Sequence, residues 1–186
     1  MSEVRRVDAG NRALCIRKTL ASDIDAVLEM ERDPGNSPFI GQWSREQHAA
    51  VIDGAGEHCV IAPGGDSALV GYLIAYDLTA EGFGVWIQRI AVSTKSRGIG
   101  RAVLSAYLAD AMSRLVADSA ILDVMPTNLR AQRMYRALGF VEAGLASEER
   151  ARLGDLVGGF DEDGIVMRLA GEALHSRGGH EVQIVG

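Results

Sequence analysis

The sequence is poor in cysteine, proline and aromatic residues. Among 186 residues there are two cysteines and four prolines, and aromatic residues make up 5%. No linker, internal repeat or low-complexity block is present, so nothing marks a boundary between two domains. Cys15 and Cys59 each lie in a short apolar run. This context favours two buried thiols in a reducing cytoplasm over a disulfide or a catalytic cysteine.

Basic residues and long apolar runs are also scarce. Lys and Arg number 19 against 25 Asp and Glu, which gives a net charge of −6. This balance argues against a nucleic acid or an anionic membrane as partner, whereas a cationic substrate is better tolerated. The polar N-terminus is followed by no long apolar stretch, so we expect neither a signal peptide nor a transmembrane helix. The four histidines form no ligand-spaced cluster with the cysteines, which predicts no metal site.

The residues that are present suit one domain with a single core. Hydrophobic residues make up 47% and charged residues 24% of the chain, as in an ordinary globular protein. We predict one domain over residues 1–170 and a loosely ordered tail over 171–186. We expect the protein to be cytoplasmic and to act as a monomer or homodimer.

Apolar runs and turn signals predict the secondary structure. Strands are expected at 13–18, 58–62, 69–76, 85–92, 120–124 and 165–169. A turn at 63–66 and the spacing of the next strand suggest an antiparallel meander.

Helices are expected at four places, with a loop at 33–38. Ser22 with Asp25, and Ser44 with Gln47, have the spacing of helix-capping pairs. The second of these helices would run to about residue 53, and two more would span 101–118 and 128–139. Together these elements predict an α/β (α+β) fold with a central mixed, mostly antiparallel sheet and helices on both faces.

The junction at residues 89–104 reads as a strand, a short turn with Gly98 and Gly100, and a helix. Glycines at such a junction let successive backbone N–H groups converge on one point, and the helix N-terminus adds about half a positive charge. Lys95, Arg97 and Arg101 add full charges nearby. This pattern suits a phosphate group, although a turn that only packs a helix on a sheet would use the same glycines. The turn lacks the Gly-Lys-Ser/Thr ending of a P-loop. It also lacks the third glycine and the later acidic residue of a dinucleotide-binding fold.

A second constellation lies at the start of the helix at 128–139. Asn128 and Tyr135 are seven residues apart, about two helical turns, so they share a face with the small Ala131. This face can line a groove with donors and a hydroxyl. A helix-capping Asn and a half-buried core Tyr would give the same pattern.

The two constellations together resemble a known family. Arg97-Gly98-Ile99-Gly100, preceded by Arg89-Ile90-Ala91-Val92, is similar to the acyl-CoA motif of the GNAT (Gcn5-related) N-acetyltransferase superfamily. Asn128-x-x-Ala131-x-x-x-Tyr135-x-x-x-Gly139-Phe140 resembles its second motif, in the right order and separation. The similarity covers residues 13–170 and is nearest to bacterial ribosomal-protein N-terminal acetyltransferase-like members, with less specific matches at 39–43 and 163–167.

The resemblance implies acetyl-CoA as co-substrate and an N-acetyltransferase domain over 1–170. The backbone of 90–92 would bind the pantetheine arm, where a splayed strand pair leaves groups unpaired, and 98–103 would cradle the diphosphate. Lys95 stands where the family usually has Arg or Gln, but it keeps the charge. The implied cofactor-binding residues are Ile90, Ala91, Val92, Lys95, Arg97, Gly98, Ile99, Gly100, Arg101, Ala102, Val103, Asn128 and Tyr135.

The resemblance also implies a catalytic acid, Tyr135, which would protonate the leaving thiolate. Asp123 stands where the ribosomal-protein branch has a Glu five residues before the motif Asn, so it is the candidate base or else a structural Asp at a strand end. Other relatives carry an acidic residue before the glycine turn. Here Trp86 and Gln88 occupy that stretch, Gln88 could position a water, and Glu81 is a weaker base candidate.

The acceptor is an amine in this interpretation. Phe39, Trp43, Trp86 and Gln88, with the acidic run 161–163, could shape a slot for it, or could be core residues and a solvated loop. Deprotonating a lysine at pH 7 costs roughly 4–5 kcal/mol and an α-amine only about 1 kcal/mol, which favours a protein or peptide N-terminus. Direct transfer in a ternary complex is expected, because neither cysteine is near the motifs. The alternatives are a polyamine or aminoglycoside acetyltransferase and a non-catalytic acyl-CoA-binding module.

Overall fold

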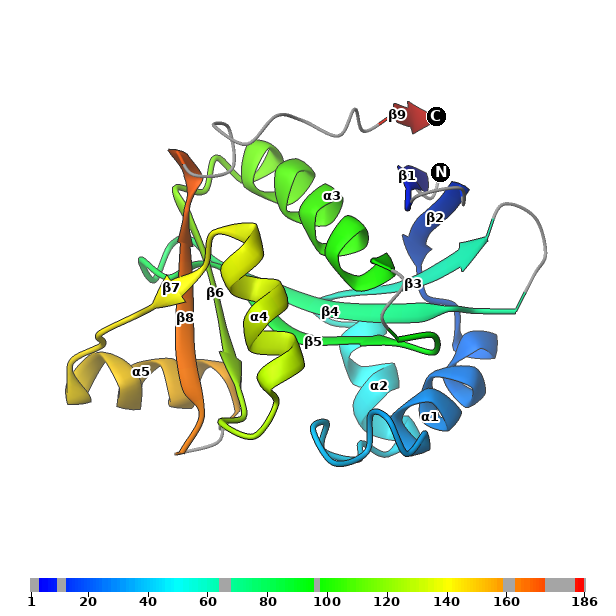
Figure 1. Cartoon of the computed structure of the whole chain (residues 1–186), viewed down its shortest axis with the longest axis horizontal. Coiled ribbons are helices and arrows are strands. Elements are labelled where there is room, and N and C mark those ends of the chain that lie inside the picture. Colours follow the sequence, from blue (N-terminus) through cyan, green and yellow to red (C-terminus); the bar gives the residue numbers. More distant parts are fainter. Residues whose placement is uncertain are drawn as a thin grey trace.

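The computed structural model describes residues 4–9, 13–63, 68–95, 98–158, 163–172 and 183–185. Within these ranges nine strands form one sheet in the order β7-β8-β6-β5-β4-β3-β2-β1-β9 (Figure 1). The strands are β1 (Val4–Asp8), β2 (Ala13–Lys18), β3 (Glu57–Pro63), β4 (Gly71–Leu78), β5 (Gly84–Val92), β6 (Ser119–Val124), β7 (Val141–Glu142), β8 (Ile165–Ala170) and β9 (Gln183–Val185). Neighbouring strands are antiparallel except β5 and β6, which are parallel. The predicted mixed, mostly antiparallel sheet is confirmed.

Helices cover both faces of the sheet. They are α1 (Ile24–Arg32), α2 (Arg45–Ile52), α3 (Ile99–Arg114), α4 (Leu129–Leu138) and α5 (Ser147–Val157). Successive strand residues point to opposite faces, so Ile61 and Leu73 pack with α3 and α4 whereas Val60 and Tyr72 pack with α1 and α2. Helix α5 buries Leu153 against a third cluster on β5, β6 and β8. Helices on both faces are therefore confirmed, but the buried apolar residues form three clusters instead of the single core that the sequence predicts.

The middle of the sheet is opened where β5 and β6 diverge. The parallel pairing covers only Val85 to Ile87 on β5, opposite Ala120 to Leu122 on β6. Beyond this point β5 continues to Val92 and stays paired with β4, and β6 continues to Val124 and stays paired with β8. The facing edges of the two strands thus have no strand partner over 88–92 and 123–124. The splayed pair implied by the sequence resemblance is confirmed.

A β-bulge lies at the same point. Ile74 pairs with Arg89 and Ala75 pairs with Ile87, so Gln88 is an extra residue on β5. A bulge redirects side chains and increases local twist, and it often adjoins an active site.

Most of the predicted elements are confirmed. All six expected strands are present, although β4 starts at Gly71, two residues late. Helix α2 begins after Ser44, whose side chain accepts the Gln47 N–H while the Gln47 side chain accepts the Ser44 N–H. Helix α4 ends at Gly139, whose φ of 104° is left-handed. The turn expected at 63–66 falls almost entirely outside the described residues.

Several details correct the sequence-based predictions. The first helix is not capped by Ser22 and Asp25: a 3₁₀ turn, Ala21–Asp23, precedes it, and the Asp23 carboxylate accepts the Leu20 N–H at 2.8 Å. Helix α3 ends at Arg114 instead of 118, and Val116 then takes a left-handed φ of 52°.

Other elements were not expected from the sequence. They are β1, β7 and α5, together with β9 in the predicted tail, which pairs with β1. The predicted boundary between a domain over 1–170 and a tail over 171–186 remains a prediction. No helix among the described residues is long and apolar enough to cross a membrane.

Candidate active site

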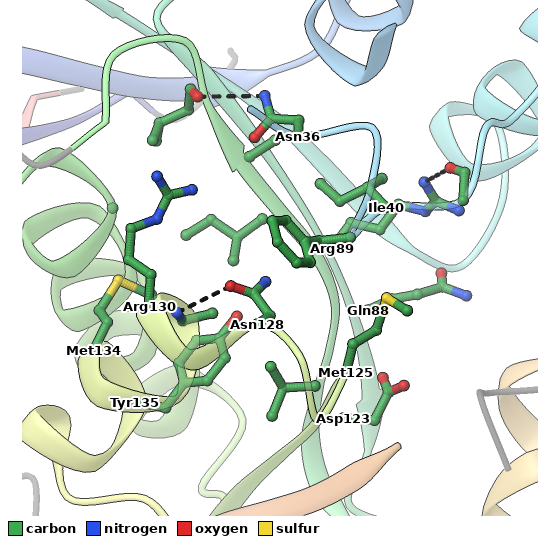
Figure 2. Close-up of a pocket in the computed structure, with 18 of the residues that line it drawn as sticks. Asn36, Ile40, Gln88, Arg89, Asp123, Met125, Asn128, Arg130, Met134 and Tyr135 are labelled. Atoms are coloured by element: carbon green, nitrogen blue, oxygen red, sulfur yellow. Dashed lines mark hydrogen bonds between the residues drawn. The ribbon is translucent and has the colours of Figure 1, made fainter. Parts of the chain in front are cut away.

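A cavity of about 820 Å³ opens at the divergence of β5 and β6 (Figure 2). Its wall combines the loop between α1 and α2, the end of β5, the start of α3, the end of β6 and one face of α4. This volume lies within the range of roughly 300–1,000 Å³ that is usual for ligand sites. Most of the residues predicted from the sequence to bind acetyl-CoA lie on this wall. They are Ile90, Ala91, Val92, Lys95, Gly98, Ile99, Gly100, Arg101, Asn128 and Tyr135.

One end of the cavity is formed by the glycine turn. Gly98 is the N-cap of α3 with a left-handed φ of 74°, a conformation that costs a residue with a Cβ about 1 kcal/mol or more. At Gly100 an added Cβ would lie 3.4 Å from Met134 Sδ on α4, an ordinary van der Waals contact, so packing of the two helices does not itself require the glycine. The first backbone N–H groups of α3 have no helical acceptor. They supply an anion-binding helix N-terminus at the cavity wall.

The two last residues predicted for the diphosphate site lie elsewhere. The Ala102 N–H already donates to the Gly98 carbonyl at 3.0 Å, and Val103 is fully buried in the core below α3. Neither residue is on the cavity wall. Arg97 lies outside the described residues.

Lys95 is positioned by the protein itself. Its Nζ donates to Asn36 Oδ1, on the loop after α1, and to the Val92 carbonyl. Burial lowers the pKa of Lys95 to about 8, and the charge of Arg130 lowers it further against the opposing charge of Asp33. The lysine keeps the basic character of this end of the cavity together with Arg101 and Arg130, but it also ties the loop after α1 to the end of β5.

Helix α4 presents the predicted face of Asn128, Ala131 and Tyr135 to the cavity. Asn128 is the N-cap, and its Oδ1 accepts the Ala131 N–H at 3.2 Å. Tyr135 is 7% exposed. Burial, followed by the negative charge of Asp123, raises the pKa of its phenol well above the ordinary value. Tyr135 therefore stays protonated at neutral pH and can donate a hydrogen bond.

Asp123 lies on β6 beyond the last residue paired with β5, and it lines the cavity. Its effect on the pKa of Tyr135 places the two groups within electrostatic reach. Figure 2 shows Asp123, Gln88 and Met125 on one side of the cavity and Tyr135 on the other. Glu81, the weaker base candidate, lies in the turn between β4 and β5, where its carbonyl accepts a hydrogen bond from Arg152, and it is not on the wall.

The end of the cavity predicted to bind the acceptor has all four predicted residues on its wall, although Trp86 is only 1% exposed and packs in the third apolar cluster. Phe39, Trp43, Trp86 and Gln88 are on its wall, and the Gln88 Nε2 donates to the Val157 carbonyl at 3.3 Å. Of the predicted acidic run, residues 161 and 162 lie outside the described residues. Lining residues that sequence analysis missed include Asn36, Ile40, Tyr76, Arg89, Met125, Arg130 and Met134.

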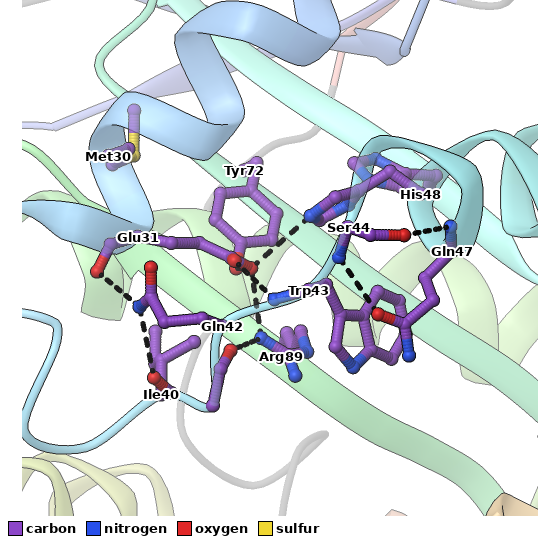
Figure 3. A network of polar contacts seen from close by, with 12 residues as sticks. Met30, Glu31, Ile40, Gln42, Trp43, Ser44, Gln47, His48, Tyr72 and Arg89 are labelled. Atoms are coloured by element: carbon purple, nitrogen blue, oxygen red, sulfur yellow. Dashed lines mark hydrogen bonds and ion pairs between the residues drawn. The ribbon is translucent and has the colours of Figure 1, made fainter.

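A buried polar network behind this end was also missed (Figure 3). Glu31 has 0% exposure, and its Oε1 accepts hydrogen bonds from the Tyr72 hydroxyl at 2.5 Å and from Arg89 Nη1 at 2.9 Å. Its Oε2 accepts the Trp43 N–H at 3.1 Å. The sequence did hold one signal, because Glu31 follows Ile24, Val27 and Leu28 on the buried face of α1. A charge on an apolar helix face is rarely buried unless it is paired.

The network extends to two histidines. His48 Nε2 lies 3.4 Å from Glu31 Oε1, its Nδ1 is 2.9 Å from His58 Nε2, and His58 Nδ1 is 2.8 Å from Thr19 Oγ1. Burial lowers the pKa of His58 to about 4, with a further contribution from His48. Two imidazoles do not make a metal centre, and the described residues contain no group of three possible ligands.

The free thiols play no part in this site. Cys59 is buried, and burial raises the pKa of its thiol to about 11. Cys15 is half-buried, and both cysteines lie on β2 and β3, away from the cavity wall. A thiol that stays protonated is a poor nucleophile.

Splayed strands, a glycine-capped helix and a protonated tyrosine define an acyl-CoA transferase site. The sequence profile of the acetyltransferase (GNAT) family matches residues 24–140, and the chain belongs to this family. It is an N-acetyltransferase that uses acetyl-CoA as donor. The free strand edge, the helix N-terminus at Gly98 and three basic side chains fit the arm and the diphosphate of this donor.

Comparison with solved structures agrees on the fold. The ribosomal-protein-S18-alanine N-acetyltransferase of Escherichia coli superposes with a TM-score of 0.61 at 19% identity, covering 84% of this chain and 93% of that chain. Mycobacterium smegmatis RimJ, in complex with CoA-disulfide, superposes with a TM-score of 0.65 at 18% identity, covering 94% of this chain and 91% of that chain. Vibrio cholerae spermidine N-acetyltransferase, in complex with CoA and spermine, superposes with a TM-score of 0.65 at 15% identity, covering 87% of this chain and 98% of that chain. No curated protein matches the chain by sequence.

Proposed function

We propose that the chain transfers the acetyl group of acetyl-CoA to the N-terminal α-amine of a protein or peptide. The observation that carries this proposal is the pair Asp123 and Tyr135, which face one cavity from opposite sides of the splayed strands. Asp123 is the one carboxylate among the described residues of the cavity wall. Transfer of the acetyl group then depends on one weak base and one phenol, and this suits an amine that is easily deprotonated.

The reaction runs directly between the two substrates. The neutral amine attacks the thioester carbon, a C–N bond forms, and the C–S bond breaks as the thiolate leaves. Asp123 accepts a proton from the amine, directly or through a water. Tyr135 donates its hydrogen bond, and finally its proton, to the sulfur. Because the phenol pKa is raised, Tyr135 acts mainly by stabilising the charge that develops on sulfur.

The choice of an α-amine rests on proton energetics. An α-amine has a pKa of about 7.7–8.0, so a carboxylate can assist its deprotonation at neutral pH at a cost of about 1 kcal/mol. A lysine or polyamine nitrogen, with a pKa of about 10.4, costs roughly 4–5 kcal/mol. A polyamine would also bring several positive charges to a cavity whose described wall holds one carboxylate. A single cationic group, by contrast, would meet the charge of Asp123.

The test is a panel of acceptors with acetyl-CoA at pH 7.5. We expect turnover with peptide α-amines and much slower turnover with spermidine and with an aminoglycoside. Exclusive use of the polyamine or the aminoglycoside would contradict the proposal. Binding of acetyl-CoA by calorimetry without transfer to any amine would instead indicate a non-catalytic acyl-CoA-binding module.

The catalytic roles are tested by two substitutions. Tyr135→Phe removes only the hydroxyl, and we expect kcat to fall about 10²–10³-fold with the Kd of acetyl-CoA unchanged, because a donor to the developing charge is lost. Asp123→Asn should lower kcat about 10²-fold with the Kd of acetyl-CoA unchanged, because the acceptor of the amine proton is lost. Full activity of Tyr135→Phe would exclude the phenol as the acid, and full activity of Asp123→Asn would exclude the carboxylate as the base.

A further inference from the structure

The guanidinium of Arg89 is held flat at the acceptor end of the cavity. Its Cζ lies 4.1 Å from the centroid of the Trp43 ring, which is a cation–π contact. One edge of the group is occupied, because Nη1 donates to Glu31 Oε1 at 2.9 Å and to the Gly41 carbonyl at 2.5 Å. Figure 3 shows Arg89 beside Trp43 with these contacts on one edge. A planar guanidinium fixed in this way points its remaining donors in a defined direction.

The other edge of the group is available. Within the described residues, no side chain or carbonyl accepts a hydrogen bond from Arg89 Nη2, whereas the side chain as a whole is only 11% exposed and lines the cavity. Nη2 is not among the described buried polar atoms that lack a hydrogen-bond partner, so it reaches solvent, where a water or a ligand can accept from it. Arg89 lines the cavity together with Phe39 and Trp43, which were predicted to receive the acceptor, and its guanidinium lies against the Trp43 ring.

Glu31, on α1, holds the Arg89 guanidinium in this position. Its buried carboxylate holds both Arg89 and the backbone N–H of Trp43, and its backbone carbonyl accepts a hydrogen bond from Gln42 Nε2 at 3.0 Å. The same residue therefore sets the position of the guanidinium and of the loop that carries the aromatic wall. Neutralising the arginine charge with a buried carboxylate also leaves the hydrogen-bonding geometry, more than net charge, to select the ligand.

On these grounds, and resting on the proposed function, we propose that Arg89 Nη2 binds a carbonyl or carboxylate oxygen of the acceptor. The substrate class is then amines that carry such an oxygen, namely peptide N-termini or free amino acids, in preference to polyamines or simple alkylamines. Arg89 is a specificity-determining residue, and Glu31 is a positioning residue that acts through it. The alternative, that Arg89 merely ties loop 40–43 to β5, makes a different prediction for the test below.

The test compares three acceptors that share a phenyl ring and a primary amine. They are phenylalanylglycine amide, free phenylalanine, and 2,2-difluoro-2-phenylethylamine, whose fluorines lower the amine pKa toward that of a peptide while no carbonyl is present. We expect kcat/KM for the dipeptide amide or the amino acid to exceed that for the fluorinated amine by about tenfold or more, the value of one charge-assisted hydrogen bond. The two oxygen-bearing acceptors distinguish a peptide carbonyl from a carboxylate.

The Arg89→Gln variant then separates recognition from support of the loop. If Arg89 binds the oxygen, the variant raises KM for the oxygen-bearing acceptors about tenfold, changes the fluorinated amine less than twofold, and leaves the Kd of acetyl-CoA unchanged. Equal losses for all acceptors, or a wild-type enzyme that uses all of them equally well, would overturn the inference. Arg32→Gln, at an exposed arginine off the cavity wall, is the matched control.

Two further measurements keep the outcome decisive. Glu31→Gln should reproduce part of the KM effect, and the double variant should lose little more than Arg89→Gln alone, since the two residues act as a unit. Should Arg89→Gln fail to fold, Arg89→Lys is the substitute. It keeps the positive charge but lacks the paired N–H donors of the planar guanidinium, and it should show the same selective loss. Turnover of spermidine with no turnover of any α-amine would defeat the proposed function itself, whereas indifference to the carbonyl would defeat only the role of Arg89.

Discussion

Lys95 is a residue whose charge state would respond to the donor. In the structure its pKa is lowered to about 8, chiefly by burial. A diphosphate beside it would favour the charged form and raise that pKa. Donor binding near pH 8 would therefore take up a proton, and affinity would be fully present below pH 8 and lost as the pH rises above it.

The measurement is calorimetry with acetyl-CoA between pH 6.5 and 9.5. We expect the Kd to increase above about pH 8, with proton uptake visible as a dependence of the heat on the buffer. Lys95→Gln should bind more weakly at pH 7 and remove this pH dependence. A wild-type Kd that is constant across the range would show that Lys95 keeps its contacts with Asn36 and Val92 when the donor binds.

His58 makes a second prediction at the same scale. Its pKa is lowered from 6.5 to about 4, first by burial and then by the charge of His48, against the opposing charge of Glu31. The unfolded chain therefore binds more protons than the folded one below pH 6.5, so stability falls as the pH drops from 6.5 toward 4. At pH 5 this residue alone would reduce the free energy of unfolding by about 2 kcal/mol relative to pH 8.

Denaturant unfolding at pH 5 and pH 8 checks this expectation. His58→Gln should be less stable at pH 8, because it disrupts contacts with His48 and Thr19. Its stability should nevertheless change less between the two pH values than that of the wild type. If the variant shows the full wild-type pH dependence, His58 is not the group responsible.

At the scale of the element, the start of α3 combines a structural and a binding role. Gly98 and Gly82 both have left-handed φ angles, of 74° and 82°, and an added Cβ would meet nothing within 4 Å at either position. Replacing either by Ala therefore introduces backbone strain without a clash. We expect each variant to lose about 1 kcal/mol of stability.

Only one of the two should affect the donor. Gly98→Ala alters the helix N-terminus on the cavity wall and should weaken acetyl-CoA binding, whereas Gly82→Ala lies in the turn between β4 and β5 and should not. Thermal unfolding and calorimetry on both variants give the comparison. Equal acetyl-CoA affinity in the two would show that the conformation of Gly98 does not matter for the donor.

The elements that sequence analysis predicted well are those encoded over short distances. The Ser44–Gln47 cap, the left-handed Gly139 and the face shared by Asn128 and Tyr135 each depend on residues within two helical turns. The network of Glu31 with Arg89 could not be derived in this way, because the partners are 58 residues apart and meet only across the finished sheet. The Ser22 cap failed for a similar reason, since Asp23 is drawn to Leu20 and Arg17.

At the scale of the whole molecule, the predicted sheet was correct in type but incomplete at its edges. Strands β1 and β7 and the three residues of β9 lie at or next to the two ends of the strand order. They are short, and their pairing depends on neighbours distant in the sequence. The centre of the sheet, where β4, β5 and β6 meet, consists of apolar strand segments bounded by turn signals and was placed correctly. Sequence therefore located the cavity better than it located the periphery.

The gap between β5 and β6 has one more consequence, for how the enzyme behaves as its reaction proceeds. In the site proposed here, the strand edge at 88–92 and the turn at Gly98 would bind parts of the donor that acetyl transfer leaves unaltered, since only the thioester end changes. Spent coenzyme should consequently occupy the groove about as well as fresh donor. We expect the enzyme to slow as it works, so that the ratio of acetylated to free coenzyme in its surroundings, more than the total pool, sets its rate.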